Sequence, residues 1–182
     1  NTETLKDLAA QYPDTLLTIQ LDVNDRAASF AAIEQTNQHF GSVDVVINNA
    51  GYGLFGAIEE TSEKEARDQI ETNVFGALWV TQAALPIMRA QQSGHIIQIS
   101  SIGGVNAFAS LGLYHASKWA LEAFSQSLSI EVAEFGIHVT LVEPGGFSTD
   151  WAGPSAKVSQ PIEAYAPARS KMAERRANSV AG

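Results

Sequence analysis

Short runs of apolar residues alternate along the chain with longer segments in which apolar residues recur every three or four positions. The apolar runs predict strands at 16–21, 43–47, 95–100 and 138–142. The longer segments predict helices at 5–12, 25–40, 62–86 and 112–135. Strands that alternate with helices are typical of a parallel sheet. We therefore expect an α/β fold, a Rossmann-type doubly wound sheet with helices on both faces.

Local signals fix where several of these elements begin and end. Ser62 and Glu65 have the spacing of a capping box at the start of the third helix. We expect Pro86 to bend or end that helix, because proline lacks a backbone N–H. Gly41 and Gly136 each follow the predicted end of a helix. The pattern is continuous, and it predicts a single domain over 1–182, with a loop and a helix in 150–182.

Composition removes several classes of function. The 182 residues carry 11 basic and 20 acidic side chains, and this net charge of −9 argues against partners such as nucleic acid or an anionic membrane surface. There is no cysteine, and the four histidines are scattered, so we expect no metal site. No apolar run reaches the length of a membrane span and no signal peptide is visible. We expect a cytoplasmic protein.

Tyr114 and Lys118 are four residues apart in the last predicted helix, so their side chains share one face. An ammonium beside a phenol favours phenolate, and we expect Lys118 to lower the Tyr114 pKa. A decrease of about two units corresponds to roughly 2.7 kcal/mol and would suit proton transfer. Ser101 lies thirteen residues before Tyr114. The alternative for the pair alone is a surface lysine beside a half-buried tyrosine.

Polar and glycine-containing segments follow the predicted strands. These are Asp22 after the first strand, 48–53 after the second and 144–149 after the last. In open α/β sheets, ligands bind beyond the carboxyl ends of strands. Asn73 lies inside a helix, where asparagine is unfavourable. Each feature has an ordinary alternative: a helix cap for Asp22, plain turns for the loops, and a solvent-facing side chain for Asn73.

In combination, these motifs resemble the short-chain dehydrogenase/reductase family. The order that carries the resemblance is Asp22, Asn48-Asn49-Ala50-Gly51, Asn73, Ser101, Tyr114, Lys118 and Pro144-Gly145. The resemblance implies an NAD(P)-dependent oxidoreductase that interconverts a secondary alcohol and a carbonyl. Tyr114 would be its acid and base, Ser101 would hold the substrate oxygen, and Lys118 would bind the nicotinamide ribose.

The resemblance also assigns sites. The catalytic residues are Asn73, Ser101, Tyr114 and Lys118. The cofactor-binding residues are Asp22, Val23, Asn49, Ala50, Gly51, Tyr114, Lys118, Pro144, Gly145, Phe147 and Thr149. The substrate-binding residues are Ser101, Val105, Phe108 and Trp151, whose mostly apolar character favours an apolar small-molecule substrate.

One part of the family pattern is absent. The family begins with a strand and a glycine-rich turn that holds the coenzyme pyrophosphate, and this chain shows neither. We therefore expect an internal portion of a longer enzyme, in which the central first strand and flanking elements are missing and strand 16–21 lacks its neighbour. We expect NADP(H), which many reductases of this kind use, with NAD(H) as the alternative.

Two further expectations concern the surface. Residues 150–182 correspond to the family's substrate-covering segment, in which we expect Arg169, Lys171, Arg175 and Arg176 to form a solvated helix face. Small residues along 112–135 allow close packing and favour a homo-oligomer. Two other functions stay open: a catalytically silent nucleotide-sensing or scaffold protein on this fold, and a nucleotide-sugar epimerase or dehydratase of the related longer branch.

Overall fold

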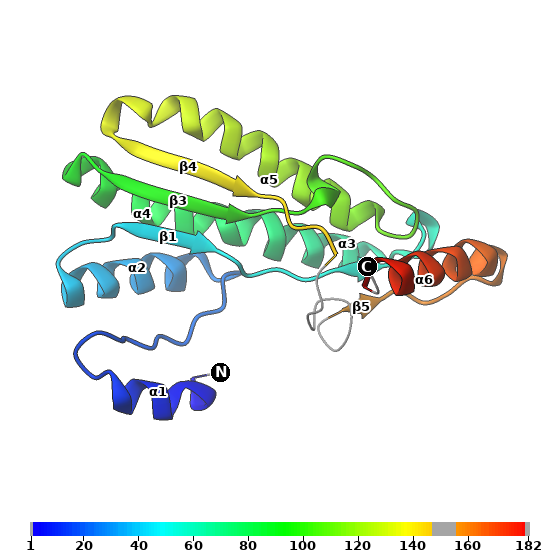
Figure 1. Cartoon of the computed structure of the whole chain (residues 1–182), viewed down its shortest axis with the longest axis horizontal. Helices are drawn as coiled ribbons and strands as arrows, with labels where there is room; N and C mark the ends of the chain where they lie inside the picture. Colours follow the sequence, from blue (N-terminus) through cyan, green and yellow to red (C-terminus); the bar gives the residue numbers. More distant parts are fainter. Residues whose placement is uncertain (1, 147–155, 181–182) are drawn as a thin grey trace.

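The computed structural model describes residues 2–146 and 156–180, and its centre is a three-stranded parallel sheet (Figure 1). The strands are β1 (Val45–Asn48), β3 (Gly94–Ile99) and β4 (Ile137–Val142), in the order β1-β3-β4. The prediction of these three strands is confirmed to within two residues. A second parallel pair, β2 (Leu54–Phe55) with β5 (Lys157–Val158), lies beyond the carboxyl ends of the sheet (Figure 1).

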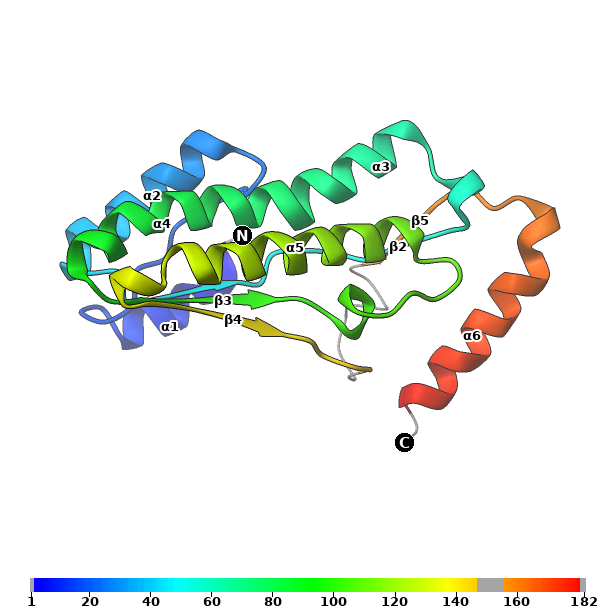
Figure 2. The ribbon, with the colours of Figure 1, turned by 90° about the horizontal axis from the view of Figure 1, so that it is seen from above.

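Helices α2, α4 and α5 cover one face of the sheet (Figure 2). The α-helices are α1 (Lys6–Gln11), α2 (Arg26–Phe40), α3 (Glu63–Ile70), α4 (Ala77–Gln91), α5 (Gly112–Glu131) and α6 (Ala166–Val180). Short 3₁₀ turns are η1 (Glu3–Leu5), η2 (Ile58–Glu60), η4 (Ile102–Gly104), η5 (Ala133–Phe135) and η7 (Glu163–Tyr165). Apolar side chains between these helices and the sheet form the core, namely Val43, Val46, Ala84, Met88, Ile96, Leu128, Val132 and Ile137.

The other face of β1 is open among the described residues. Val45 is 54 % exposed and Ile47 is 60 % exposed, whereas Val46 between them is buried. This alternation follows from the pleat of a strand, which turns successive side chains to opposite faces. The apolar side of α1 is also exposed, with Leu8 at 45 %. We expected helices on both faces of the sheet, and over β1 the described helices cover one of them (Figure 2).

The predicted helix 62–86 is a composite of three segments. Its capping box is confirmed, because Ser62 N donates to Glu65 Oε2 at 2.9 Å and Glu65 N donates to Ser62 Oγ at 3.3 Å. The segment η3 (Glu71–Gly76) between α3 and α4 is a π-helix. Such wider turns are common at functional sites.

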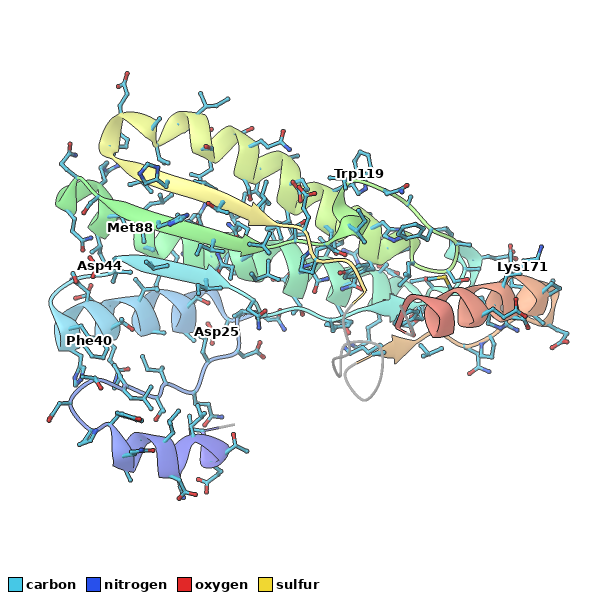
Figure 3. The ribbon with its side chains drawn as sticks, in the orientation of Figure 1. Asp25, Phe40, Asp44, Met88, Trp119 and Lys171 are labelled. Carbon is cyan, nitrogen blue, oxygen red and sulfur yellow. The ribbon has the colours of Figure 1, made fainter. Side chains whose placement is uncertain are left out.

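The prediction that the helix could end at Pro86 is wrong, because α4 continues to Gln91. Ala84 and Met88, on either side of the proline, are fully buried, and Met88 lies between α4 and the sheet (Figure 3). Their burial outweighs the loss of one backbone hydrogen bond at the proline.

The prediction of a strand at 16–21 is also wrong for this structure. These residues have no regular secondary structure, and their backbone makes no ladder with another strand in the described part of the chain. A strand needs a hydrogen-bonded neighbour, and residues 16–21 have none among the described residues: β1 pairs with β3 on one side, and its other side is a free edge of the sheet. Within ranges 2–146 and 156–180, no helix is both long and apolar enough to cross a membrane.

Candidate active site

Tyr114 and Lys118 lie on one face of α5, directed toward the carboxyl end of the sheet. Tyr114 is 5 % exposed and Lys118 is 7 % exposed. Lys118 Nζ donates to the carbonyl oxygen of Ile99 at 2.7 Å, and it lies 5.9 Å from the centre of the Tyr114 ring. The last residue of β3 thus fixes the lysine beside the tyrosine. The alternative of a surface lysine is wrong.

The expected lowering of the Tyr114 pKa does not occur in this structure. Burial raises the pKa of Tyr114, and a hydrogen bond with the Ser101 side chain offsets only part of that effect. Burial also lowers the pKa of Lys118 to about 8, although the nearby Glu122 carboxylate acts in the opposite direction. Desolvation is thus the largest influence on the pKa of both groups.

Ser101 follows β3 and faces Tyr114. Its Oγ accepts a hydrogen bond from Gly103 N at 3.0 Å, which caps the short turn η4. The neighbouring Ser100 is 3 % exposed and points toward α5 instead, because an ideal Cβ on Gly104 would lie 2.7 Å from its Oγ and 3.1 Å from Glu122 Oε1. The structure therefore brings Ser101, and not Ser100, to the tyrosine.

Asn73 lies in the π-helical segment and is 1 % exposed. Its Nδ2 donates to Tyr52 O at 3.1 Å and to Ser117 Oγ at 3.0 Å, and its Oδ1 accepts from Tyr52 N at 3.1 Å. Ser117 Oγ in turn donates to Tyr114 O at 2.6 Å. The solvent-facing alternative for Asn73 is wrong, since the side chain ties the loop after β1 to the helix of Tyr114.

The loop after β1 brings an exposed glycine to this cluster. An ideal Cβ on Gly51 would lie 3.1 Å from Asn73 Oδ1 and 3.9 Å from Lys118 Nζ. Asn49 and Ala50 before it are exposed as well. A glycine at this position leaves room for a ligand close to the backbone and beside the lysine.

The loop after β4 reaches the same edge. Ile102 N donates to Pro144 O at 2.9 Å, so Pro144 and Gly145 lie next to the segment that carries Ser101. Gly145 is exposed, and an added Cβ would meet nothing within 4 Å. Phe147, Thr149 and Trp151 lie outside the described residues.

Asp22 and Val23 lie before α2. Asp22 is exposed and its Oδ1 accepts from Asn24 N at 3.0 Å. The N-cap of α2 is Asp25, whose side chain accepts from Ala28 N, so the alternative that Asp22 is the cap is wrong. Val23 packs against Gly76, where a Cβ would lie 2.6 Å from its Cγ2.

The predicted substrate residues are only partly gathered. Val105 is 47 % exposed, and the Phe108 ring packs edge-on against His115 with a centroid distance of 5.5 Å. The residues that pack in one cluster with Tyr114 are instead Phe55 and Leu111, both buried. No sequence pattern predicts this pair, because Phe55 and Leu111 lie far apart in the chain and outside any motif.

Two further findings concern charged groups. No cluster of three or more histidine, aspartate or glutamate side chains that could hold a metal ion occurs in the described ranges. Arg169 forms an ion pair with the buried Glu60, so the prediction that it belongs to a solvated helix face is wrong.

Known proteins resemble this chain throughout. The family model for short chain dehydrogenases matches residues 1–159. Oxidoreductase BOA17 of Botryotinia fuckeliana is 42 % identical over 164 residues, covering 90 % of this chain and 60 % of that protein. The 3-ketodihydrosphingosine reductase of Bacteroides thetaiotaomicron is 46 % identical over 129 residues, covering 71 % of this chain and 48 % of that protein.

Solved structures agree. A short-chain dehydrogenase from Streptomyces avermitilis is 42 % identical with a TM-score of 0.88, covering 97 % of this chain and 66 % of its own. ElxO with NADP bound is 32 % identical with a TM-score of 0.75, covering 79 % of this chain and 59 % of its own. The chain covers 60 % of oxidoreductase BOA17 and 48 % of the 3-ketodihydrosphingosine reductase, so it spans only part of the length of these relatives. From its matched sequence and its fold, the chain belongs to the short-chain dehydrogenase family.

Proposed function

We propose that the protein is an NAD(P)-dependent oxidoreductase that interconverts a secondary alcohol and a carbonyl. The observation that carries this proposal is the meeting of Ser101, Tyr114 and Lys118 beside the exposed Gly51 at the carboxyl edge of the sheet. Ligands of such sheets bind at that edge. The site offers a proton donor, a second hydrogen-bond donor and a cation within one small region.

Each side chain has a distinct role in this proposal. In the reduction direction, the Tyr114 phenol gives its proton to the carbonyl oxygen, and in oxidation the phenolate takes it back. The Ser101 hydroxyl donates a hydrogen bond to the same oxygen and holds it against the phenol. The raised pKa of Tyr114 keeps the phenol protonated in the absence of ligands, as reduction requires.

Lys118 supplies positive charge. An ammonium has three N–H donors, and Ile99 O accepts one of them. The remaining donors are available for the ribose hydroxyls of a coenzyme and for the phenolate. With a pKa of about 8, Lys118 is mostly protonated at neutral pH.

The residues present fit part of a nicotinamide dinucleotide, which when bound supplies or accepts a hydride. A Cβ on Gly51 would crowd Asn73 and approach Lys118, so glycine keeps this corner free for a ribose. Further residues would hold the adenosine half, namely Asp22, Val23, Asn49 and Ala50. Others would hold the nicotinamide half, namely Pro144, Gly145, Phe147 and Thr149.

NADP(H) is the favoured coenzyme and NAD(H) is the alternative. Two similar structures contain NADP, those of ElxO at 32 % identity and of a gluconate 5-dehydrogenase at 26 %. A xylitol dehydrogenase at 26 % identity contains NAD⁺. The higher identity to ElxO supports NADP(H).

The substrate in this proposal is a small apolar alcohol or carbonyl compound. The buried side chains that pack with Tyr114 are Phe55 and Leu111, and neither offers a polar group. A relative from Bacteroides thetaiotaomicron is named 3-ketodihydrosphingosine reductase, which supports a ketone as the oxidised substrate. The apolar surroundings of Tyr114 favour an apolar group next to the reactive oxygen.

We also infer a homo-oligomer. The α5 helix exposes Ile130 at 81 % and Trp119 at 51 %, and Trp119 extends away from the sheet (Figure 3). Large apolar side chains on one exposed helix face support self-association. The cytoplasmic location stays a prediction.

The test combines binding and turnover. NADPH at about 100 times its dissociation constant should stabilise the protein by about 2.7 kcal/mol in thermal unfolding. NADH at the same concentration should stabilise it less. Tyr114→Phe should reduce coenzyme-dependent reduction of an apolar ketone by about 10²- to 10⁴-fold without weakening coenzyme binding. The matched control is Tyr12→Phe, at a residue that is 47 % exposed on the far side of the molecule.

The outcomes separate the three functions. Coenzyme binding with no turnover, unaffected by Tyr114→Phe, would favour a nucleotide-sensing or scaffold protein. Product formation with no net change in coenzyme would favour an epimerase or dehydratase.

A further inference from the structure

A buried carboxylate holds the C-terminal segment, defined as residues 156–180, against the turn η2. The Glu60 side chain is 1 % exposed. Its Oε1 accepts from Ile162 N at 2.8 Å and pairs with Arg169 Nη1, while its Oε2 accepts from Ala57 N at 2.6 Å. Arg169 Nη1 also donates to Ile162 O at 2.9 Å. These hydrogen bonds and the guanidinium hold the pKa of Glu60 below its usual value.

The other contacts of the C-terminal segment with this region lie mainly along β5, where Lys157 Nζ is 4.1 Å from the centre of the Tyr52 ring and Ser159 packs against Gly56. β5 adds two backbone hydrogen bonds to β2, from Lys157 N to Gly53 O at 2.9 Å and from Ser159 N to Phe55 O at 2.8 Å. Tyr165 Oη donates to Glu59 Oε2 in η2 at 2.6 Å, and this hydrogen bond is exposed. A two-stranded pairing is marginal by itself. Of the two side-chain contacts that join the start of α6 to η2, the ion pair of Glu60 and Arg169 is the buried one.

The same segment reaches the proposed catalytic tyrosine. Met172 on α6 packs against the buried cluster of Phe55, Leu111 and Tyr114. Arg169 and Met172 are three residues apart on a helix and so lie on one side of it. Fixing the guanidinium at Glu60 consequently fixes the position of Met172 at the cluster.

The turn that carries Glu60 is also joined to the start of α5. Gly56 N donates to Ser110 O at 3.0 Å, and an ideal Cβ on Gly112 would lie 2.2 Å from Ile58 Cδ1. Residues 56–60 thus contact both the C-terminal segment and the backbone two residues before Tyr114. Figures 1 and 2 place α6 beyond the carboxyl ends of the strands, the edge at which ligands of open α/β sheets bind.

We infer that Glu60 is a positioning residue for the substrate site: through Arg169 it seats Met172 against Phe55, Leu111 and Tyr114, and so completes an apolar wall beside the phenol. This inference rests on the proposed function, because the wall matters only if a substrate binds at Tyr114. Met172 then limits the size of the apolar group that this wall accepts.

The first experiment tests whether the ion pair of Glu60 and Arg169 holds the C-terminal segment, and it requires no activity assay. Amide hydrogen exchange in residues 156–172 should accelerate on the order of tenfold in Arg169→Ala, because removal of one partner leaves the Glu60 charge buried and unpaired. Exchange in the middle of α5 should stay unchanged. Lys171→Ala is the matched control, since Lys171 is an exposed cation on the same helix (Figure 3).

The second experiment measures KM and substrate preference with a homologous series of straight-chain methyl ketones. Arg169→Ala should raise KM for these ketones on the order of tenfold, and the coenzyme dissociation constant should be unchanged. Arg169→Lys keeps the positive charge and should raise KM less than Arg169→Ala does. Met172→Ala should shift the preference toward longer ketones by roughly tenfold per methylene group. Glu60→Gln should behave as Arg169→Ala does, and the double variant should show no further loss.

The results separate the two proposals. If amide exchange in Arg169→Ala is unchanged, the ion pair of Glu60 and Arg169 does not hold the C-terminal segment. If exchange is faster but KM is unchanged, the ion pair holds the segment but does not position substrate. If Met172→Ala has the same ketone preference as the parent protein, Met172 does not limit the size of the substrate. If the parent protein binds coenzyme but reduces none of the ketones, the proposed function fails first and the substrate role of Glu60 fails with it. Should Glu60→Gln not fold, the partly exposed Arg169 still carries the test.

Discussion

Asn73 Nδ2 lies 3.0 Å from Ser117 Oγ and donates a hydrogen bond that links the π-helical segment to α5. The same amide group holds both backbone groups of Tyr52. The contact with Ser117 is buried and the two contacts with Tyr52 are partly buried. The side chain thus ties together the loop after β1 and the helix that carries Tyr114.

Replacement of Asn73 by alanine should therefore destabilise the protein. Three hydrogen bonds are lost and Tyr52 N is left without its acceptor, whereas Tyr52 O keeps the hydrogen bond from Gln69 Nε2 at 3.0 Å. The free energy of unfolding should fall by about 2–4 kcal/mol. Urea denaturation measures this change. Asn24→Ala is the control, since the Asn24 side chain accepts an exposed hydrogen bond from Thr72 Oγ1 and its loss should cost less than about 0.5 kcal/mol. Equal losses in the two variants would contradict the role given to Asn73.

The buried Lys118 should make stability depend on pH in the alkaline range. Its pKa is about 8 in the folded protein and 10.5 otherwise, so between these values the unfolded chain binds more protons than the folded one. Stability due to this group therefore rises as pH increases from about 8 to 10.5, by about 3 kcal/mol at most.

The comparison with Lys118→Met isolates that effect. Denaturant unfolding at several pH values should show the parent gaining stability relative to the variant between pH 8 and 10. Tyr114 does not disturb this window, because its raised pKa contributes only above about 10. A pH-independent difference between parent and variant would show that Lys118 is not desolvated.

Ser101 and Ser100 should differ sharply although they are adjacent. Ser101→Ala removes the hydroxyl that faces Tyr114 and should reduce turnover by about 10²- to 10³-fold, as expected for one donor to a developing oxyanion. In Ser100→Ala the lost Oγ is buried and has no hydrogen-bond partner in the described structure, so turnover and stability should be nearly unchanged. Steady-state kinetics of both variants decides which serine holds the substrate oxygen, and a larger loss in Ser100→Ala would reverse the assignment.

Gly51→Ala should act on coenzyme binding more than on folding. The added methyl would lie 3.1 Å from Asn73 Oδ1, a tight but adjustable contact, and 3.9 Å from Lys118 Nζ. We expect the NADPH dissociation constant to rise on the order of tenfold, whereas the unfolding free energy without coenzyme should fall by about 1 kcal/mol or less. Fluorescence titration and thermal unfolding measure the two quantities. An unaffected dissociation constant would place the coenzyme away from this loop.

Much of the fold was predictable because its signals are local. The apolar runs at β1, β3 and β4, the capping box at Ser62 and the glycine after α2 each act within a few residues. The failures had non-local causes. Residues 16–21 have the composition of a strand but lack a neighbour to pair with, and α4 continues through Pro86 because Met88 beyond it is buried in the core.

The sequence by itself determined the family, the parallel α/β class and the helical spacing that puts Tyr114 and Lys118 on one face of α5. Only the tertiary structure decided the direction of the Tyr114 pKa shift and the burial of Glu60 under Arg169. The physical reason is that spacing along a helix fixes which side chains share a face. Desolvation and long-range ion pairs instead depend on which distant segments, such as η2 and α6, come to cover those side chains.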